Sequence, residues 1–149
     1  MSVTAPRPNS VTADTYQRLL HFYATQMQCL DLGEIDKWVS TFTVDGVFDA
    51  NAQPEPARGR EAIGAAARGM ADDLARRGVV QRHWIGNLVV LAVDDDGLIR
   101  TRSYAQVVDA QAGGPTKLRL SAVCEDVLVP YADAWQVRER RVRRDDLPE

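Results

Sequence analysis

Two side chains of this sequence carry acid–base chemistry, His83 and Asp31. A histidine titrates near neutral pH, so it can both accept and donate a proton. Asp31 lies four residues after Met27, at the end of an apolar helical stripe. Because desolvating a carboxylate is costly, Asp31 is either paired with another group or points into solvent where the helix frays. These two residues are therefore the first candidates for a catalytic role.

A long apolar run after His83 predicts the strand that positions this histidine. Residues 88–93 are apolar and are followed by a turn at 94–97, which indicates a strand over residues 79–93. Side chains alternate between the two faces of a strand, so one face is expected to carry His83, Ile85, Asn87 and Val89. Two polar groups among apolar neighbours indicate a polar spot in an apolar pocket, so Asn87 is a candidate substrate-binding residue.

Helical periodicity predicts three helices. The first begins after Thr12, a suitable N-cap, and ends near Leu32, before Gly33. Its apolar stripe comprises Tyr16, Leu20, Tyr23, Met27 and Leu30, widened by Leu19 and Phe22. A short helix over 34–41 follows, and a third runs from Gly59 to Gly78. The inward face of the third helix is expected to comprise Ile63, Ala66, Ala67, Met70 and Leu74.

The second half of the chain is predicted to be a sheet. A short strand at 47–50 and a proline-containing loop at 51–58 come before the third helix. Four strands separated by glycine-containing turns then follow, at 79–93, 98–109, 116–129 and 135–143. This order predicts an α+β fold in which helices pack on a curved antiparallel sheet, leaving a cone that is open at one end. We expect a flexible lead-in at 1–11, one domain at 12–144 and a tail at 145–149.

Composition excludes several classes of protein. The chain has 149 residues, of which 45% are hydrophobic and 26% charged, as in soluble globular domains. Its net charge of −3 argues against nucleic-acid binding, and no apolar run is long enough to span a membrane. Cys29 and Cys124 have no metal-binding spacing, so we interpret them as reduced thiols and expect no metal site. The start of the chain has no apolar signal core, so a cytoplasmic location is expected.

Five segments between residues 16 and 142 carry motifs that are specific in combination. They are Leu30–Trp38, Thr41–Phe48, Gly59–Ile63, His83–Asn87 and Trp135–Arg140. Together they resemble the SnoaL-like group of the nuclear-transport-factor-2-like superfamily. This group contains small polyketide cyclases and dehydratases related to scytalone dehydratase. The resemblance implies the cone-shaped fold with three N-terminal helices.

The resemblance also implies a catalytic pair. In the dehydratase branch, the aspartate that ends the first helix works with the histidine that opens the long strand, and these positions match Asp31 and His83. A second pocket histidine of that branch would fall near Ala105 here, which departs from the pattern. The implied reaction is cyclisation, dehydration or isomerisation of a small, hydrophobic, polyketide-like substrate, without metal or cofactor.

Other side chains are candidates to shape the pocket around this pair. They are Tyr23, Gln26, Trp38, Asn87 and Tyr104. Aromatic rings would exclude water from the pocket, although each is also compatible with an ordinary core position. A histidine on an apolar face is likewise compatible with a satisfied core position.

Two alternatives to this function stay open. One is an epoxide-opening hydrolase or cyclase of the same fold, which needs an Asp-Arg-Asp set that the sequence does not locate. The other is a non-catalytic ligand-binding or oxygenase-associated subunit. The family commonly forms homodimers through the outer sheet face. We interpret Arg138, Arg140 and Arg144 as a solvated or interface face. Arg102 and Arg119 could bind an enolate or carboxylate, but isolated strand arginines more often lie on a solvated or interface face as well.

Overall fold

Local signals at the chain's helix ends set the positions of the helices in the computed structural model, which describes residues 10–149. Helix α1 (Ala13–Asp31) begins at Thr12, whose side chain accepts a hydrogen bond from the Thr15 backbone N–H. It ends before Gly33, which has a positive φ of 74°. This left-handed turn lets the Glu34 N–H bond the Cys29 carbonyl, so the chain leaves the helix directly after Asp31.

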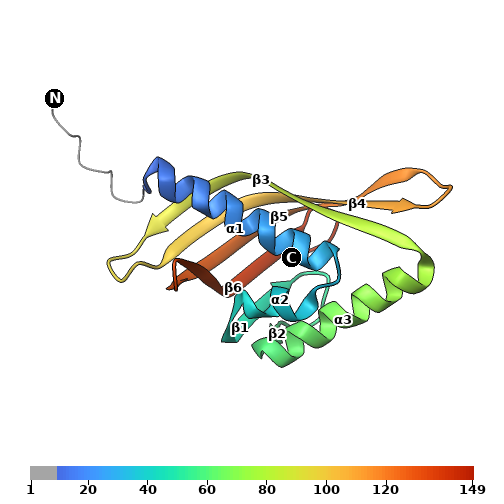
Figure 1. The fold of residues 1–149 in the computed structure, drawn as a ribbon, viewed down its shortest axis with the longest axis horizontal. Helices are drawn as coiled ribbons and strands as arrows, with labels where there is room; N and C mark the ends of the chain where they lie inside the picture. The colour runs from blue at the N-terminus through green and yellow to red at the C-terminus, as the bar shows by residue number, and fades with distance from the viewer. Residues whose placement is uncertain (1–9) are drawn as a thin grey trace.

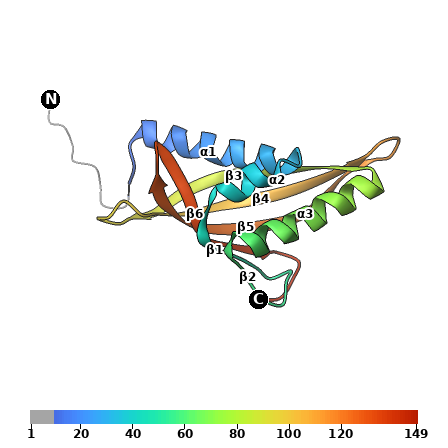
Figure 2. The ribbon, with the colours of Figure 1, turned by 60° about the horizontal axis from the view of Figure 1, so that its bottom comes forward.

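Two further helices complete the helical layer. Helix α2 (Ile35–Ser40) follows α1 at once, and α3 (Gly59–Arg77) ends at Gly78, whose φ is 64°. Figure 1 shows α1 running along β3 and α3 lying beside β1, with α2 between the two long helices. Figure 2 shows this helical layer against the sheet from a second direction.

The strands form one mixed sheet. They are β1 (Phe42–Ala50), β2 (Ala57–Arg58), β3 (Val79–Val93), β4 (Ile99–Gln111), β5 (Thr116–Tyr131) and β6 (Ala134–Arg144). Within the described residues the sheet order is β2-β1-β6-β5-β4-β3. The predicted antiparallel meander is present from β3 to β6, but β1 pairs with β6 in parallel. This long-range pairing between the first and last long strands leaves no trace in local sequence periodicity.

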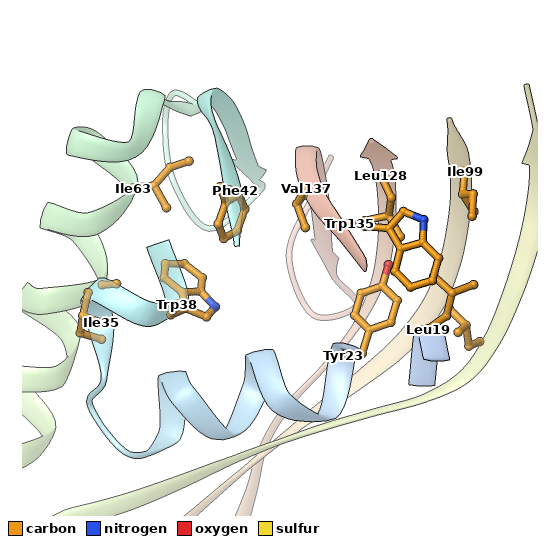
Figure 3. Close-up of a cluster of buried hydrophobic side chains, with 12 residues drawn as sticks. Leu19, Tyr23, Ile35, Trp38, Phe42, Ile63, Ile99, Leu128, Trp135 and Val137 are labelled. Atoms are coloured by element: carbon orange, nitrogen blue, oxygen red, sulfur yellow. The ribbon is translucent and has the colours of Figure 1, made fainter. Parts of the chain in front are cut away.

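The main core lies between the helices and the inner face of the sheet (Figure 3). Its buried members come from all three helices and from β1, β3, β4, β5 and β6, and include Leu19, Phe42, Ile63, Leu128 and Val137. Trp38 stacks edge-on against Phe42, with ring centroids 4.9 Å apart. The core therefore fixes α1 and α2 to the sheet, which holds the C-terminal end of α1 in place.

Bulges in the strands change which side chains face this core. In β3 the pairing register shifts between Gly86 and Val89, and Asn87 has a φ of 53°. Beyond this point Leu88 is buried and Val89 is exposed. The prediction that Asn87 and Val89 share the face of His83 is therefore wrong, because the bulge reverses the alternation.

The inward face of α3 is narrower than predicted. Ile63 and Ala67 are buried as expected, but Ala66 and Met70 are exposed. The buried residues of α3 are Ile63, Gly64 and Ala67, so the buried stripe lies in the first half of the helix. Among residues 10–149, no helix combines the length and the apolar character that a membrane span requires.

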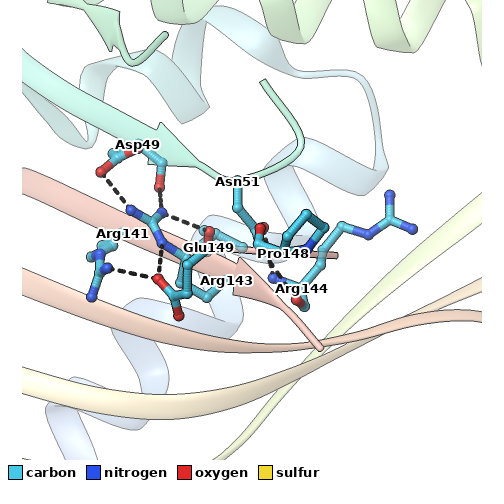
Figure 4. Close-up of polar contacts among 8 residues, drawn as sticks. Asp49, Asn51, Arg141, Arg143, Arg144, Pro148 and Glu149 are labelled. Atoms are coloured by element: carbon cyan, nitrogen blue, oxygen red, sulfur yellow. Dashed lines mark hydrogen bonds and ion pairs between the residues drawn. The ribbon is translucent and has the colours of Figure 1, made fainter. Parts of the chain in front are cut away.

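The chain ends are placed differently from one another. Most of the expected lead-in, residues 1–9, lies outside the described residues. The expected tail folds back along β6, where the Glu149 carboxylate contacts Arg141 at 3.1 Å and Arg143 at 3.4 Å (Figure 4). Asn51, just after β1, donates to the Arg144 carbonyl and accepts its backbone N–H. These contacts tie residues 145–149 to the edge of the domain.

Candidate active site

The C-terminal end of α1 brings Asp31 against His83 of β3. Asp31 Oδ1 lies 2.6 Å from His83 Nδ1, and Asp31 Oδ2 accepts the His83 backbone N–H at 3.1 Å. The Asp31 side chain is 7% exposed and that of His83 is 21% exposed. The carboxylate is thus covered, while part of the imidazole stays open to solvent.

This geometry selects one form of the histidine. An ionised carboxylate only accepts hydrogen bonds, so the proton of the neutral imidazole lies on Nδ1. The unprotonated Nε2 is then the atom that can act as a base. If the ring becomes an imidazolium, the Asp31 charge stabilises it, as in other His–Asp pairs.

The position of His83 on the sheet explains the second contact. Strand β3 lies at the edge of the sheet, so half of its backbone groups lack a neighbouring strand. Side chains of α1 satisfy some of these groups. Asp31 accepts the His83 N–H, and the Tyr16 hydroxyl donates to the Leu88 carbonyl at 2.8 Å. Helix α1 therefore both covers the edge strand β3 and positions Asp31 against His83.

A second polar group lies inside the core. Asp126 accepts two hydrogen bonds from Arg140, at 3.0 Å and 2.8 Å, and one from the Tyr23 hydroxyl at 2.7 Å. Arg140 also donates to Gln26 Oε1 at 2.7 Å, and Gln26 donates in turn to Thr41. Tyr23 and Gln26 are thus buried, hydrogen-bonded members of one network, which we call the Arg140 network.

Burial and charge shift the pKa values of this network. Burial, and secondarily the Asp126 charge, raises the pKa of Tyr23 well above its usual value. Burial alone would lower the pKa of Arg140, but the Asp126 charge and hydrogen bonds outweigh it, so the pKa is raised. Arg140 therefore stays cationic and Tyr23 stays neutral, as a closed set of hydrogen bonds requires.

The prediction of a solvated face for Arg140 is wrong. Arg140 is only 5% exposed, whereas Arg138 is exposed to solvent. Between β5 and β6 the register shifts at Val127 and Leu128, which pair with Glu139 and Val137 and leave Arg138 as a bulge. The bulge turns Arg140 inward opposite Asp126. A buried Asp–Arg pair was missed because strict alternation places Arg140 on the outer face.

The other candidate residues lie in three different environments. Trp38 is buried in the main core, and its Nε1–H has no hydrogen-bond partner within residues 10–149. Asn87 is exposed at the β3 bulge. Tyr104 is exposed on the outer face, because Ser103 and Ala105 on either side of it face inward and are buried. The structure therefore brings Asp31 and His83 together but does not gather all five proposed pocket residues around them.

The outer face of the sheet carries a hollow of about 510 Å³. Its lining includes Trp84, Gly86, Tyr104, Gln106, Ser121 and Val123. Neither Asp31 nor His83 lines it, since both lie on the opposite, helix-covered side. Within residues 10–149, no group of three or more His, Cys, Asp or Glu side chains is placed to hold a metal ion.

Comparison with known proteins assigns the chain to a family. The SnoaL-like domain model matches residues 11–141. The chain therefore belongs to the SnoaL-like domain family. Comparison with curated protein sequences gives no match.

Three solved structures are similar over nearly the whole chain. Aln2 from a Streptomyces species is 29% identical, with 91% of this chain and 94% of that chain covered and a TM-score of 0.83. ActVI-ORFA from Streptomyces coelicolor is also 29% identical, with coverages of 93% and 100% and a TM-score of 0.83. A protein from Catenulispora acidiphila, solved in complex with S-DNPA, is 31% identical, with coverages of 91% and 96% and a TM-score of 0.76.

More distant structures show the fold alone. An NTF2-like protein with a cystatin-like fold from Novosphingobium aromaticivorans is 19% identical, with coverages of 89% and 83% and a TM-score of 0.75. A chain from the same organism, named as the beta subunit of a putative aromatic-ring-hydroxylating dioxygenase, is 18% identical, with coverages of 89% and 90% and a TM-score of 0.70. The protein thus has the α+β NTF2-like fold that was predicted.

Proposed function

We propose that this protein is a cofactor-independent general acid/base enzyme, a cyclase, dehydratase or isomerase of polyketide-type metabolism in the cytoplasm. The observation that carries the proposal is the double contact of the Asp31 carboxylate with the side chain and backbone of His83. Membership of the SnoaL-like family supports a reaction of the cyclase or dehydratase type.

The proposed chemistry begins with His83 Nε2 as the base. It removes a proton from a carbon next to a substrate carbonyl, and the electron pair of the C–H bond moves into the enolate. Asp31 stabilises the imidazolium that forms. The proton then returns to a different atom: a departing hydroxyl in dehydration, a carbonyl oxygen in aldol cyclisation, or another carbon in isomerisation.

Asp31 and His83 fit this role better than a purely structural one. A histidine that only filled the core would not need its imidazole 21% exposed. Both carboxylate oxygens of Asp31 accept hydrogen bonds from His83, and this holds the imidazole in one tautomer and one orientation.

The Arg140 network bears on the epoxide-opening alternative. It supplies an Asp–Arg pair, Asp126 and Arg140, that an epoxide hydrolase of this fold would need. However, Asp126 already accepts three hydrogen bonds, and both residues are almost completely buried. We therefore assign this network to stabilising the fold. The likeness to a dioxygenase subunit is one of fold only and does not favour the oxygenase-associated alternative.

We also propose that two copies pair through the outer sheet face. Trp84 is 67% exposed, Tyr104 is 54% exposed, and Val80, Val89 and Leu118 are exposed on the same three strands, β3 to β5. Large apolar side chains gathered on one face indicate a protein–protein surface.

The test of the proposed function follows an α-proton transfer and the elimination of water that can follow it. The probe is an aryl β-hydroxyketone that carries a naphthyl ring and deuterium at the α-carbon. We expect the enzyme to exchange this deuterium for solvent protons and to release the enone and water, as followed by NMR and absorbance. Absence of both reactions with the wild-type protein would contradict the proposal.

A further inference from the structure

The face of the sheet that carries His83 also carries a polar chain that the proposed acid–base chemistry does not use. Gln81 lies two residues before His83 in β3, so the two side chains point to the same face. Gln81 Nε2 donates to Asp109 Oδ1 of β4 at 2.9 Å. Arg119 Nη1 of β5 donates to Asp109 Oδ2 at 3.3 Å. This polar chain, Gln81–Asp109–Arg119, therefore crosses three neighbouring strands beside His83.

The guanidinium at its end is available to a ligand. The Arg119 side chain is 36% exposed, and its bond to Asp109 is its only hydrogen bond within residues 10–149. Arg119 is the extra residue of a bulge, since Val107 pairs with Leu120 and Val108 with Leu118. This bulge leaves Arg119 outside the regular pairing and lets it reach Asp109.

The local charge favours an anion. Lys117 pairs with Asp109 across the two strands, so Asp109 has two cations as neighbours, Lys117 and Arg119. One carboxylate thus faces two positive charges, and Asp109 uses both of its oxygens on Gln81 and Arg119. An additional anionic group would find a net positive charge and unused guanidinium N–H groups, which bind carboxylates in bidentate geometry.

The other side of His83 on the same face is apolar. Ile85 lies two residues after His83 and packs against the buried cluster of Ala105, Ala122 and Cys124. His83 therefore stands between an apolar cluster and the Gln81–Asp109–Arg119 chain. Strands β3 and β5 are about 10 Å apart across β4, which sets the scale between the imidazole and the guanidinium.

Building on the proposed function, we propose that the substrates of the His83 site are aromatic carboxylic acids whose carboxylate binds Arg119. The apolar body would lie toward Ile85, the carboxylate toward Arg119, and the reacting carbon between them at His83. Asp109 is a positioning residue that orients the guanidinium.

The test compares two probes of the same shape and different charge, naphthylacetate and naphthylacetamide, by titration calorimetry. We expect the wild-type protein to bind the acid more tightly than the amide. In Arg119→Met, acid affinity should fall about 10- to 100-fold, the range for a hydrogen-bonded charged group, while amide affinity stays the same. Arg119→Lys should retain part of the preference, because it keeps the charge but loses the two-pronged geometry.

Arg102 provides a matched control. It is exposed and lies on the opposite face of β4, between the buried Thr101 and Ser103, so Arg102→Met should leave both affinities unchanged. Equal binding of acid and amide by the wild type, no binding of either, or equal losses in the Arg119 and Arg102 variants would overturn the proposal. Failure of the proposed function would be seen separately from failure of this proposal. The neutral β-hydroxyketone tests proton transfer without using Arg119. Acid binding tests Arg119 without proton transfer, so His83→Ala should still bind the acid more tightly than the amide.

Discussion

The Asp31 carboxylate contacts His83 through both of its oxygens, one at the imidazole Nδ1 and one at the backbone N–H. These residues are 52 positions apart in the chain, and the contact joins the end of α1 to the edge of the sheet. The arrangement separates two tasks. Burial of Asp31 makes it an orienting group, and partial exposure of His83 leaves Nε2 free for a substrate.

Replacing the histidine should remove activity and leave the fold intact. We expect His83→Ala to lower α-proton exchange by about 10²- to 10⁴-fold, the usual contribution of a general base. The fold should be retained, because alanine keeps the residue-83 backbone N–H that the Asp31 carboxylate accepts. His21→Ala is the matched control, since His21 is exposed on α1. An exchange rate for His83→Ala equal to that of this control would end the catalytic assignment.

Replacing the aspartate by its amide should disturb the tautomer. Two N–H donors of His83 point at the Asp31 carboxylate, but Asp31→Asn offers only one acceptor oxygen and one NH₂ group. The NH₂ group would favour a proton on Nε2, where the ring no longer acts as a base. We expect at least a tenfold loss of kcat, and nitrogen NMR should show the change of tautomer. Wild-type kcat with an unchanged NMR signature would remove Asp31 from the mechanism.

Local signals explain why the helices and strands could be predicted from the sequence. Thr12 and Gly78 act through the backbone next to them, and period-two alternation within a strand is also local. The Asp31–His83 contact is not local, and only the resemblance to a family pointed to it. The parallel pairing of β1 with β6 had no such signal, because it depends on packing across the whole domain.

Bulges account for the largest errors at the site. A single extra residue reverses every later side chain in a strand, and no residue type announces its position unambiguously. The bulge at Asn87 exposes Val89, and the bulge at Arg138 buries Arg140. Alternation alone therefore could not predict the Arg140 network, because it places Arg140 on the outer face of the sheet.

Breaking the Arg140 network should destabilise the protein strongly. Arg140→Met leaves the Asp126 carboxylate buried without its cation, which costs about 3–5 kcal/mol of unfolding free energy. Adding Asp126→Leu removes the unpaired buried carboxylate. The double variant should therefore lose less unfolding free energy than the sum of the losses in the two single variants. Urea unfolding measures these values. Arg138→Met, an exposed change in the same strand, should stay within about 0.5 kcal/mol, and a similar small effect of Arg140→Met would refute this role.

Alkaline pH should destabilise the fold through Cys124. Burial raises the pKa of this thiol from 9.0 to about 11. Between these values the unfolded chain releases the proton while the folded one keeps it, so stability is lost as pH rises from 9 toward 11. The loss approaches about 2–3 kcal/mol. Unfolding curves at several pH values should show a shallower decline for Cys124→Ala than for wild type. Cys29→Ala should have a smaller effect, because burial also raises the pKa of Cys29 but this thiol is less buried. Identical declines in all three proteins would contradict the assignment.

Pairing of two copies through the outer sheet face should depend on Trp84. This side chain is 67% exposed beside the hollow that Tyr104 also lines. Burying a large aromatic ring is among the strongest contributions to a protein interface, so Trp84→Ser should convert a dimer into a monomer in analytical ultracentrifugation. Val44→Ser is the control, because Val44 is exposed on β1, away from β3 and β4. A monomeric wild type, or a dimer that survives Trp84→Ser unchanged, would show that this face does not pair two copies.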